Sequence, residues 1–134
     1  MMRRAIDLAL TRLGQTAPNP AVGCVLVKDG AVIAEAATAP GGRPHAEEQA
    51  LLAAGELAVG ATAYVTLEPC GERSSGVASC AERLIAGGVV RVVYACDQDD
   101  PLSGGRGPAA LRAAGVSVER GCLASQAAGL KAGG

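Results

Sequence analysis

The 134-residue chain contains no phenylalanine and no tryptophan, and its only aromatic side chains are Tyr64 and Tyr94. Unpaired nucleic-acid bases are commonly held by stacking on aromatic rings, so this scarcity argues against single-strand recognition. The chain has 28 alanines instead, within a hydrophobic fraction of 49%. We therefore expect a core of small and aliphatic side chains in which helices and strands pack closely.

The chain also lacks an excess of charge and a long apolar run. Twelve basic and thirteen acidic residues give a formal net charge of −1, which excludes the basic surface that a long nucleic acid requires. The apolar stretches are shorter than the roughly 18 residues of a membrane span, so no membrane partner is expected. Residues 1–4 resemble the start of a signal peptide, but Asp7 and Arg12 interrupt the segment that follows. We therefore expect a cytoplasmic protein.

The length fits a single domain over residues 1–134. Helices are expected where apolar residues recur at helical spacing, and strands where β-prone runs are bounded by turn residues. The expected helices are residues 3–13, 46–54, 80–86 and 108–114, and the expected strands are residues 22–27, 31–34, 63–67, 89–95 and 116–118. In the first helix, Ile6, Leu10 and Leu13 form the apolar stripe that is expected to face the core.

The order of these elements predicts an α/β fold. Asp29-Gly30 between the first two strands is typical of an antiparallel hairpin. From residue 46 onward, helices alternate with strands, which favours parallel pairing with right-handed crossovers. We expect a mixed sheet of about five strands with helices on both faces.

Five cysteines in a chain without an export signal are unlike a disulfide framework. Cys24 and Cys96 lie in strand-like apolar runs, and Cys122 has no polar neighbour, so all three are expected to be core residues. Cys70 and Cys80 stand in a different context. We consider metal binding as the role of these two cysteines.

His45, Cys70 and Cys80 form a three-ligand zinc set that leaves a fourth tetrahedral position for water. A bound zinc ion lowers the pKa of its water to about 7, and a nearby carboxylate can then move protons. Glu47 is placed for that role. Because residues i and i+2 of a helix point apart, His45 and Glu47 can converge only if His45 precedes the helix start.

The sequence also supports both thiolates. Ser79 and Glu82 form a Ser-x-x-Glu capping box, which puts Cys80 in a first helical turn where the helix dipole favours a negative sulfur. Cys70 comes just after a strand. The site is therefore expected at the carboxyl ends of the parallel strands.

A histidine with two cysteines is more often structural than catalytic, but here the chain's one histidine lies in a His-x-Glu step and is followed by Pro69-Cys70. His-x-Glu with Pro-Cys-x-x-Cys is the signature of zinc-dependent base deaminases. This chain differs in having nine residues between its two cysteines. A catalytic site and a purely structural zinc site both remain open at this point.

Four segments together resemble the deaminase domain of the bifunctional riboflavin-biosynthesis deaminase/reductase, over about residues 3–121: residues 17–30, 44–47, 66–70 and 84–89. That resemblance implies a three-layer α/β/α cytidine-deaminase-like fold and a long interval between the zinc cysteines. It implies that His45, Cys70 and Cys80 bind Zn²⁺, that Glu47 is the catalytic proton shuttle, and that Asn19 contacts the substrate. The reductase domain has no counterpart in these residues.

The chain departs from that family at Thr38, in the loop 71–79, which carries no histidine, and at residues 98–101. In that loop Arg73 is the residue that we expect to bind a substrate phosphate. The main chain around Ala46 and Glu68 is expected to orient the ring. Residues 104–107, a glycine-rich run, could hold a phosphate at their N–H groups, but a turn before a helix that opens at Pro108 explains them as well, and we favour the turn.

The predicted function is hydrolytic deamination of a small aminopyrimidine, by resemblance the phosphoribosylated diaminopyrimidinone of riboflavin biosynthesis. The alternatives are a deaminase of a free base or nucleoside (cytosine, cytidine or guanine type) and a non-catalytic module stabilised by zinc. We expect a homo-oligomer, a dimer, and a separate reductase stays open as a further partner.

Overall fold

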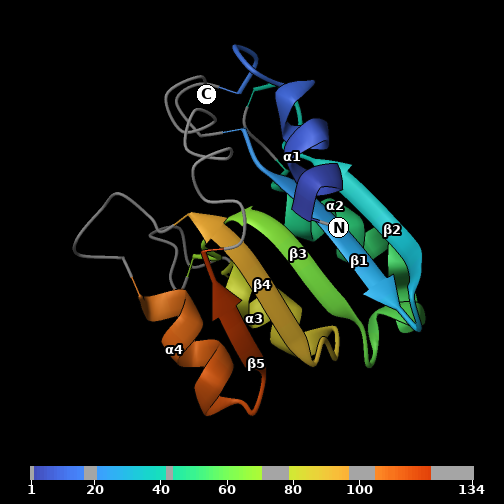
Figure 1. The fold of residues 1–134 in the computed structure, drawn as a ribbon, viewed down its shortest axis with the longest axis vertical. Coiled ribbons are helices and arrows are strands. Elements are labelled where there is room, and N and C mark those ends of the chain that lie inside the picture. Colours follow the sequence, from blue (N-terminus) through green and yellow to red (C-terminus); the bar gives the residue numbers. More distant parts are fainter. Residues whose placement is uncertain (1, 17–20, 42–43, 71–78, 97–104, 122–134) are drawn as a thin grey trace.

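The structure is a computed structural model that describes residues 2–16, 21–41, 44–70, 79–96 and 105–121. Helices and strands alternate along most of the chain, with one short 3-10 helix, η1, before the third strand (Figure 1). Their bounds are α1 Met2–Leu10, β1 Gly23–Lys28, β2 Ala31–Ala37, α2 Ala46–Ala54, η1 Gly55–Ala58, β3 Thr62–Leu67, α3 Cys80–Ala86, β4 Arg91–Cys96, α4 Arg106–Ala113 and β5 Ser117–Arg120.

The five strands form one mixed sheet in the order β2-β1-β3-β4-β5. β1 runs antiparallel to β2 and to β3, whereas β3, β4 and β5 are parallel to one another. The turn between β1 and β2 places Asp29 and Gly30 at φ 53° and 79°, as the two central residues of a type I′ hairpin turn require. The predicted mixed sheet, an antiparallel hairpin joined to a parallel half, is confirmed.

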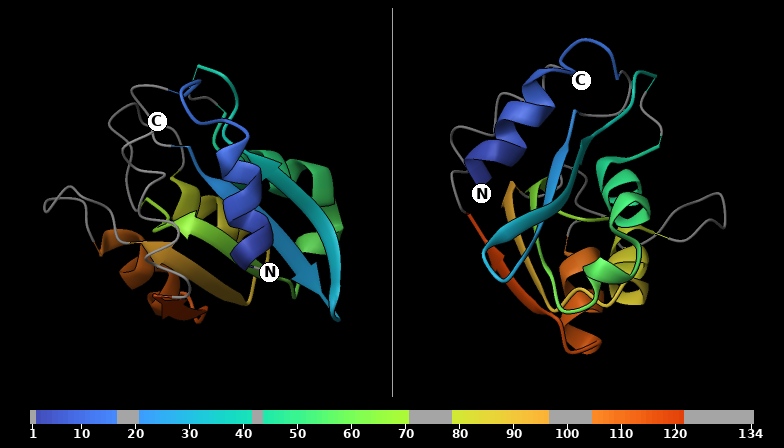
Figure 2. Two further views of the ribbon diagram at one scale, coloured as in Figure 1. Left: turned by 45° about the horizontal axis from the view of Figure 1, so that its top comes forward. Right: turned by 90° about the vertical axis from the view of Figure 1, so that its right-hand side faces the viewer.

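Helices cover both faces of this sheet and give three layers. Figure 2 shows α1 alone on one side and α2, α3 and α4 together on the other. α1 packs on β1, β2 and β3, while α2 packs on β1 and β2 and contacts α3, which in turn contacts α4. This arrangement brings the N-terminal ends of α2 and α3 to the same edge of the sheet.

The buried face of α1 differs from the expected stripe. Ile6 is buried, but Leu10 and Leu13 are exposed, and the other buried side chains of the helix are those of Met2, Ala5 and Ala9. The helix approaches β1 so closely that a Cβ on Gly23 would lie 1.8 Å from the carbonyl oxygen of Ala5. Small residues at this contact set the orientation of α1, and the helix ends at Leu10, so Leu13 lies beyond it.

The core consists of alanine, valine and leucine side chains, as the composition predicts. The largest fully buried aliphatic side chains include those of Leu26, Leu84 and Leu111, each from a different element. Cys24 and Cys96 are buried in strands, as expected, whereas Cys122 lies outside the described residues. Within the described part of the chain, no helix has the length and apolar character needed to cross a membrane.

Helix α4 begins two residues earlier than predicted. Arg106 is its first residue, so Pro108 is the third and not the first. The first-turn N–H groups of a helix have no partner within the helix, so a proline is tolerated there. Gly105 precedes the helix with φ 83°, a left-handed conformation that favours glycine.

Candidate metal centre

His45 stands immediately before α2, with extended backbone angles of φ −69° and ψ 159°. The side-chain amide of Gln49 donates hydrogen bonds to the carbonyl oxygens of Ala37, at 2.7 Å, and Pro44, at 3.0 Å. These bonds tie the segment before α2 to the end of β2. The structure therefore agrees with the requirement that His45 precedes the helix.

Cys70 and Cys80 meet at the first turn of α3. Cys80 is the first residue of this helix, and its N–H lies 3.3 Å from the Sγ atom of Cys70, to which it donates. The carbonyl oxygen of Cys70 accepts the N–H of Ala81 at 3.0 Å. Donated N–H groups and a helix N-terminus both favour the thiolate form of cysteine, which is the form that binds metals.

Ser79 and Glu82, the predicted capping residues, make the N-cap hydrogen bond of this turn and a contact between their side chains. Ser79 is fully buried, and its Oγ atom accepts the N–H of Glu82 at 3.1 Å. The same hydroxyl lies 3.2 Å from Oε1 of Glu82, to which it donates. The start of α3, and with it the position of Cys80, is therefore fixed by local hydrogen bonds.

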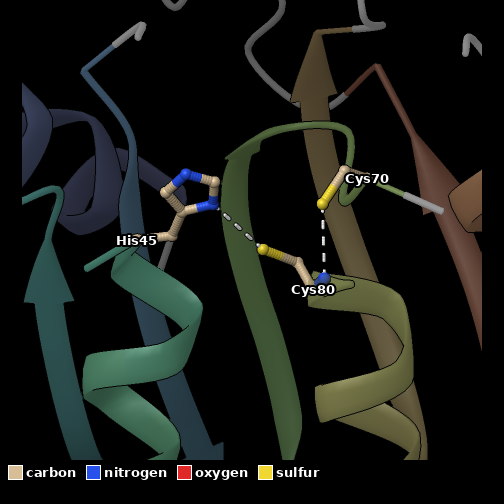
Figure 3. Close-up of side chains that lie close together, drawn as sticks. All are labelled: His45, Cys70 and Cys80. Atoms are coloured by element: carbon tan, nitrogen blue, oxygen red, sulfur yellow. Dashed lines mark hydrogen bonds between the residues drawn. The ribbon is translucent and has the colours of Figure 1, made fainter. Parts of the chain in front are cut away.

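The three predicted ligand residues converge. Their ligand atoms all lie within 4.8 Å of one another, and Nδ1 of His45 is 3.4 Å from Sγ of Cys80 (Figure 3). A tetrahedral zinc ion with bonds of about 2.0 Å to nitrogen and 2.3 Å to sulfur separates two such ligand atoms by about 3.6 Å. The His45–Cys80 pair is close to this separation, and one nitrogen with two sulfur donors is a ligand set that suits zinc.

Glu47 is the second residue of α2 and is only 4% exposed. It lies near the buried thiol of Cys24 on β1: burial first, and the charge of Glu47 second, raise the pKa of this thiol well above its usual range. Cys24 is therefore a neutral core thiol at neutral pH. The carboxyl group of Glu47 is held inside the protein, two residues from the histidine of the metal centre.

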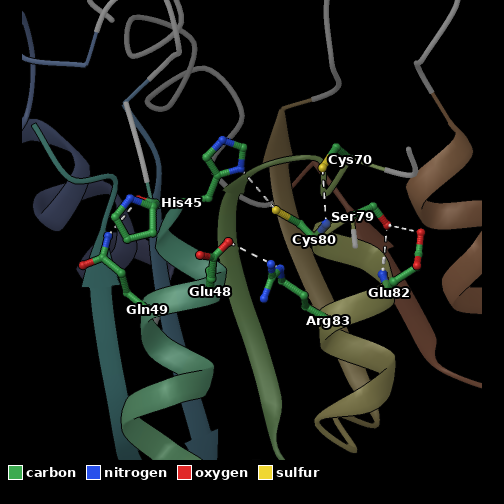
Figure 4. Close-up of polar contacts among 9 residues, drawn as sticks. His45, Glu48, Gln49, Cys70, Ser79, Cys80, Glu82 and Arg83 are labelled. Atoms are coloured by element: carbon green, nitrogen blue, oxygen red, sulfur yellow. Dashed lines mark hydrogen bonds and ion pairs between the residues drawn. The ribbon is translucent and has the colours of Figure 1, made fainter. Parts of the chain in front are cut away.

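An ion pair also joins α2 and α3, at whose starts His45 and Cys80 lie. Nε of Arg83 on α3 lies 3.4 Å from Oε1 of Glu48 on α2 (Figure 4). Both side chains are largely buried. No motif pointed to this pair, because its two members are 35 positions apart in sequence.

Two predicted substrate contacts, Asn19 and Arg73, lie outside the described residues, as do residues 71–78 and 98–101. Ala46, whose main chain was expected to orient the ring, is the first residue of α2 and is fully buried.

Thr38 is buried too. Its Oγ1 atom accepts the N–H of Val22 at 3.0 Å, and its own N–H donates to the carbonyl oxygen of Val22 at 2.9 Å. The hydroxyl at this position thus extends the contact between β1 and β2.

Sequence reasoning missed the side chain of Glu68. It is 3% exposed, and its Oε2 atom accepts the N–H of Gly105 at 2.7 Å. The glycine-rich run before α4 therefore has at least this N–H occupied by the chain's own carboxylate, which supports the interpretation of the run as a turn. Two features of the sequence could have indicated this bond: an acidic residue directly before Pro69-Cys70, and the glycine-rich run before α4.

Comparison with known proteins agrees with this geometry. Residues 1–96 match the sequence model of the cytidine and deoxycytidylate deaminase zinc-binding region. Escherichia coli RibD, a riboflavin biosynthesis protein, is 47% identical over 132 residues, which cover 98% of this chain and 36% of that protein.

Solved structures are similar as well. Acinetobacter baumannii RibD has a TM-score of 0.93 at 48% identity, over 98% of this chain and 37% of that one. A Thermotoga maritima diaminohydroxyphosphoribosylaminopyrimidine deaminase/5-amino-6-(5-phosphoribosylamino)uracil reductase has a TM-score of 0.87 at 40% identity, over 96% and 37% of the two chains. The chain thus spans about a third of the length of these relatives, and the predicted cytidine-deaminase-like fold is confirmed. The chain belongs to the cytidine and deoxycytidylate deaminase family, and within it resembles the deaminase domain of RibD.

Proposed function

We propose that residues 1–134 form one zinc-dependent deaminase domain that hydrolyses the exocyclic amino group of the phosphoribosylated diaminopyrimidinone of riboflavin biosynthesis. The observation that carries this proposal is the convergence of His45, Cys70 and Cys80 at one edge of the sheet, in a chain 47% identical to RibD. In this proposal the three residues hold Zn²⁺, and the reductase activity is supplied from outside these residues.

The reaction exchanges nitrogen for oxygen at one ring carbon. The oxygen of a water molecule bonds to the amino-bearing carbon, the carbon–nitrogen bond breaks, and ammonia leaves. The metal, when bound, makes water acidic enough to react at neutral pH.

Glu47 takes a proton from the attacking water and delivers protons to the ring nitrogen and to the departing amine. Burial of Glu47 supports this role, because a carboxyl group shielded from bulk water exchanges protons with bound groups and not with solvent. The thiolates of Cys70 and Cys80 are supported by the first turn of α3.

Replacement of Glu47 by glutamine tests the catalytic role. The variant keeps the shape of the side chain and loses proton transfer, so ammonia release should fall by about 10²–10⁴-fold while the zinc content stays unchanged. Glu56→Gln is the matched control, because it makes the same chemical change at an exposed position of η1, away from the proton shuttle. Its turnover should stay within a few-fold of wild type. Unchanged ammonia release by Glu47→Gln would refute the proton-shuttle role, whereas a zinc-loaded wild type that releases no ammonia from any aminopyrimidine would instead identify a non-catalytic zinc module.

The substrate is tested through Arg73 and Asn19, which we propose as its contacts by family resemblance and by loop position, together with the main chain of Ala46. An arginine fork can pair with two oxygens of a phosphate. Arg73→Ala should therefore lower kcat/KM for the phosphorylated substrate by the equivalent of roughly 1.5–3 kcal/mol and leave the dephosphorylated compound unaffected. Equal losses on both compounds, or a wild-type preference for the dephosphorylated one, would favour a deaminase of a free base or nucleoside.

A further inference from the structure

The main chain of Cys70 lies between two helix N-termini. On one side, the first turn of α3 donates the N–H of Ala81 to the carbonyl oxygen of Cys70 and the N–H of Cys80 to its sulfur. On the other side, the first turn of α4 packs against the Pro69–Cys70 segment. A Cβ atom on Gly107 would lie 1.7 Å from the carbonyl oxygen of Pro69 and 3.3 Å from the carbonyl carbon of Cys70. Helix α4 therefore contacts the cysteine that leads into the loop of the metal centre.

Glu68 fastens this contact. Its carboxylate accepts the N–H of Gly105 at 2.7 Å, directly before α4, and its own N–H donates to the carbonyl oxygen of Cys96 at 2.8 Å. The side chain is 3% exposed, so water does not compete for the bond. Negative charge is favoured at a helix N-terminus, and hydrogen bonds to a charged acceptor are stronger than neutral ones.

The position of Cys70 follows from these fixed points. Only Pro69, whose ring restricts φ, separates Glu68 from Cys70. With Glu68 bonded to β4 through its main chain and to α4 through its side chain, and with Gly107 against the next peptide, little rotational freedom is left to Cys70. Groups beyond the ligands themselves often set ligand orientation in metal sites in this way.

We infer that Glu68 is a positioning residue of the metal centre: through Gly105 and the first turn of α4, it holds the sulfur of Cys70 in the geometry that retains the metal. This inference rests on the metal site of the proposed function, though not on its substrate. It gives α4, which contributes none of the three ligands, a part in metal retention.

The test measures the metal directly, without substrate. Wild type, Glu68→Ala and Glu68→Gln are loaded with zinc, and the rate of zinc release to a chromogenic chelator is followed. Glu68→Ala should release zinc about 10- to 100-fold faster, the scale found when residues that support a metal ligand are replaced. Glu68→Gln should lie between wild type and Glu68→Ala, because its amide oxygen can still accept the N–H of Gly105 but carries no charge.

Cobalt substitution supplies a second measurement. The charge-transfer absorption band between the thiolate sulfurs and cobalt reports the geometry of the sulfur ligands. Glu68→Ala should therefore shift or weaken this band, whereas a substitution that only lowers stability elsewhere in the protein should not. Gly107→Ala should change the band in the same direction. Gly23→Ala is the matched control, because its Cβ would meet the carbonyl oxygen of Ala5 at 1.8 Å, an equal clash on the opposite face of the sheet.

The outcomes separate this inference from the proposed substrate. Faster zinc release and an altered cobalt band in Glu68→Ala, with a wild-type band in Gly23→Ala, support the positioning role even if no pyrimidine is deaminated. Wild-type zinc release in Glu68→Ala would overturn it. So would a change no larger than that caused by Gly23→Ala at the same loss of stability, or a wild-type chain that takes up no metal.

Discussion

Loss of the Ser79 hydroxyl should destabilise the protein by about 1–2 kcal/mol, toward the upper part of the range for helix caps. The first three N–H groups of α3 all have partners: Cys70 accepts those of Cys80 and Ala81, and the Ser79 hydroxyl accepts that of Glu82. Ser79→Ala leaves the third group without its acceptor. Ser79 is fully buried, so water does not readily replace the hydroxyl.

Urea denaturation of the metal-free protein measures this loss, and the midpoint of thermal unfolding should fall by about 4–7 °C for a chain of this size. Ser117→Ala is the matched control, because it removes a serine hydroxyl at an exposed position of β5 and should change the stability by less than about 0.5 kcal/mol. The zinc-loaded form should show a larger difference between wild type and Ser79→Ala, because zinc binds the intact first turn of α3 more tightly. A loss below about 0.5 kcal/mol in Ser79→Ala, or equal losses in Ser79→Ala and Ser117→Ala, would refute the capping argument.

Three further results are expected. Leu84→Ala, at a fully buried position, should lower the free energy of unfolding by about 2–5 kcal/mol in urea titrations, whereas Leu52→Ala at a position 77% exposed should change it by less than about 0.5 kcal/mol. Elemental analysis should find zinc lost from Cys70→Ser and retained in Cys24→Ser, and the reverse pattern would contradict the ligand assignment. Arg4 on α1 donates a hydrogen bond to the carboxylate of Glu35 on β2, and this bond lowers the pKa of Glu35. Wild type should therefore exceed Glu35→Gln in stability by less than about 1 kcal/mol at pH 7. That difference should vanish as the pH falls below the lowered pKa of the carboxyl group, and a difference that did not decrease as the protein was acidified would argue against the ion pair.

The parts of the fold that follow from local chemistry were predictable from the sequence. Asp29-Gly30 specifies a tight hairpin because both positions need positive φ angles. Ser79 and Glu82 specify where α3 begins, and the structure has the N-cap hydrogen bond from the N–H of Glu82 to the Ser79 hydroxyl. These signals lie within a few residues of the structure they determine.

Features that depend on distant contacts were not predictable. The exposure of Leu10 follows from the approach of Ala5 to Gly23, and the start of α4 at Arg106 accompanies the bond between Gly105 and Glu68. Neither contact leaves a periodic pattern in the sequence, because the partners belong to different elements. Tertiary packing decided which face and which end of each helix was used.

The candidate site divides in the same way. His45, Cys70 and Cys80 were predicted as ligands from residue type together with local motifs: the His-x-Glu step at the chain's one histidine, Pro69-Cys70, and the capping residues beside Cys80. The side chain of Glu68 escaped notice because its partner is a main-chain N–H 37 residues away, and main-chain groups carry no residue-specific signal.

The hydrogen bonds between Cys70 and the start of α3 mean that the two sulfurs do not depend on the chain between them for their spacing. Cys70 is bonded directly to Cys80 and Ala81, while nine residues separate the two cysteines in sequence. Lengthening such a connection from two residues to nine adds only about 1.3 kcal/mol of closure entropy. The number of residues between the cysteines can therefore be changed in engineered chains while the two sulfurs keep their places.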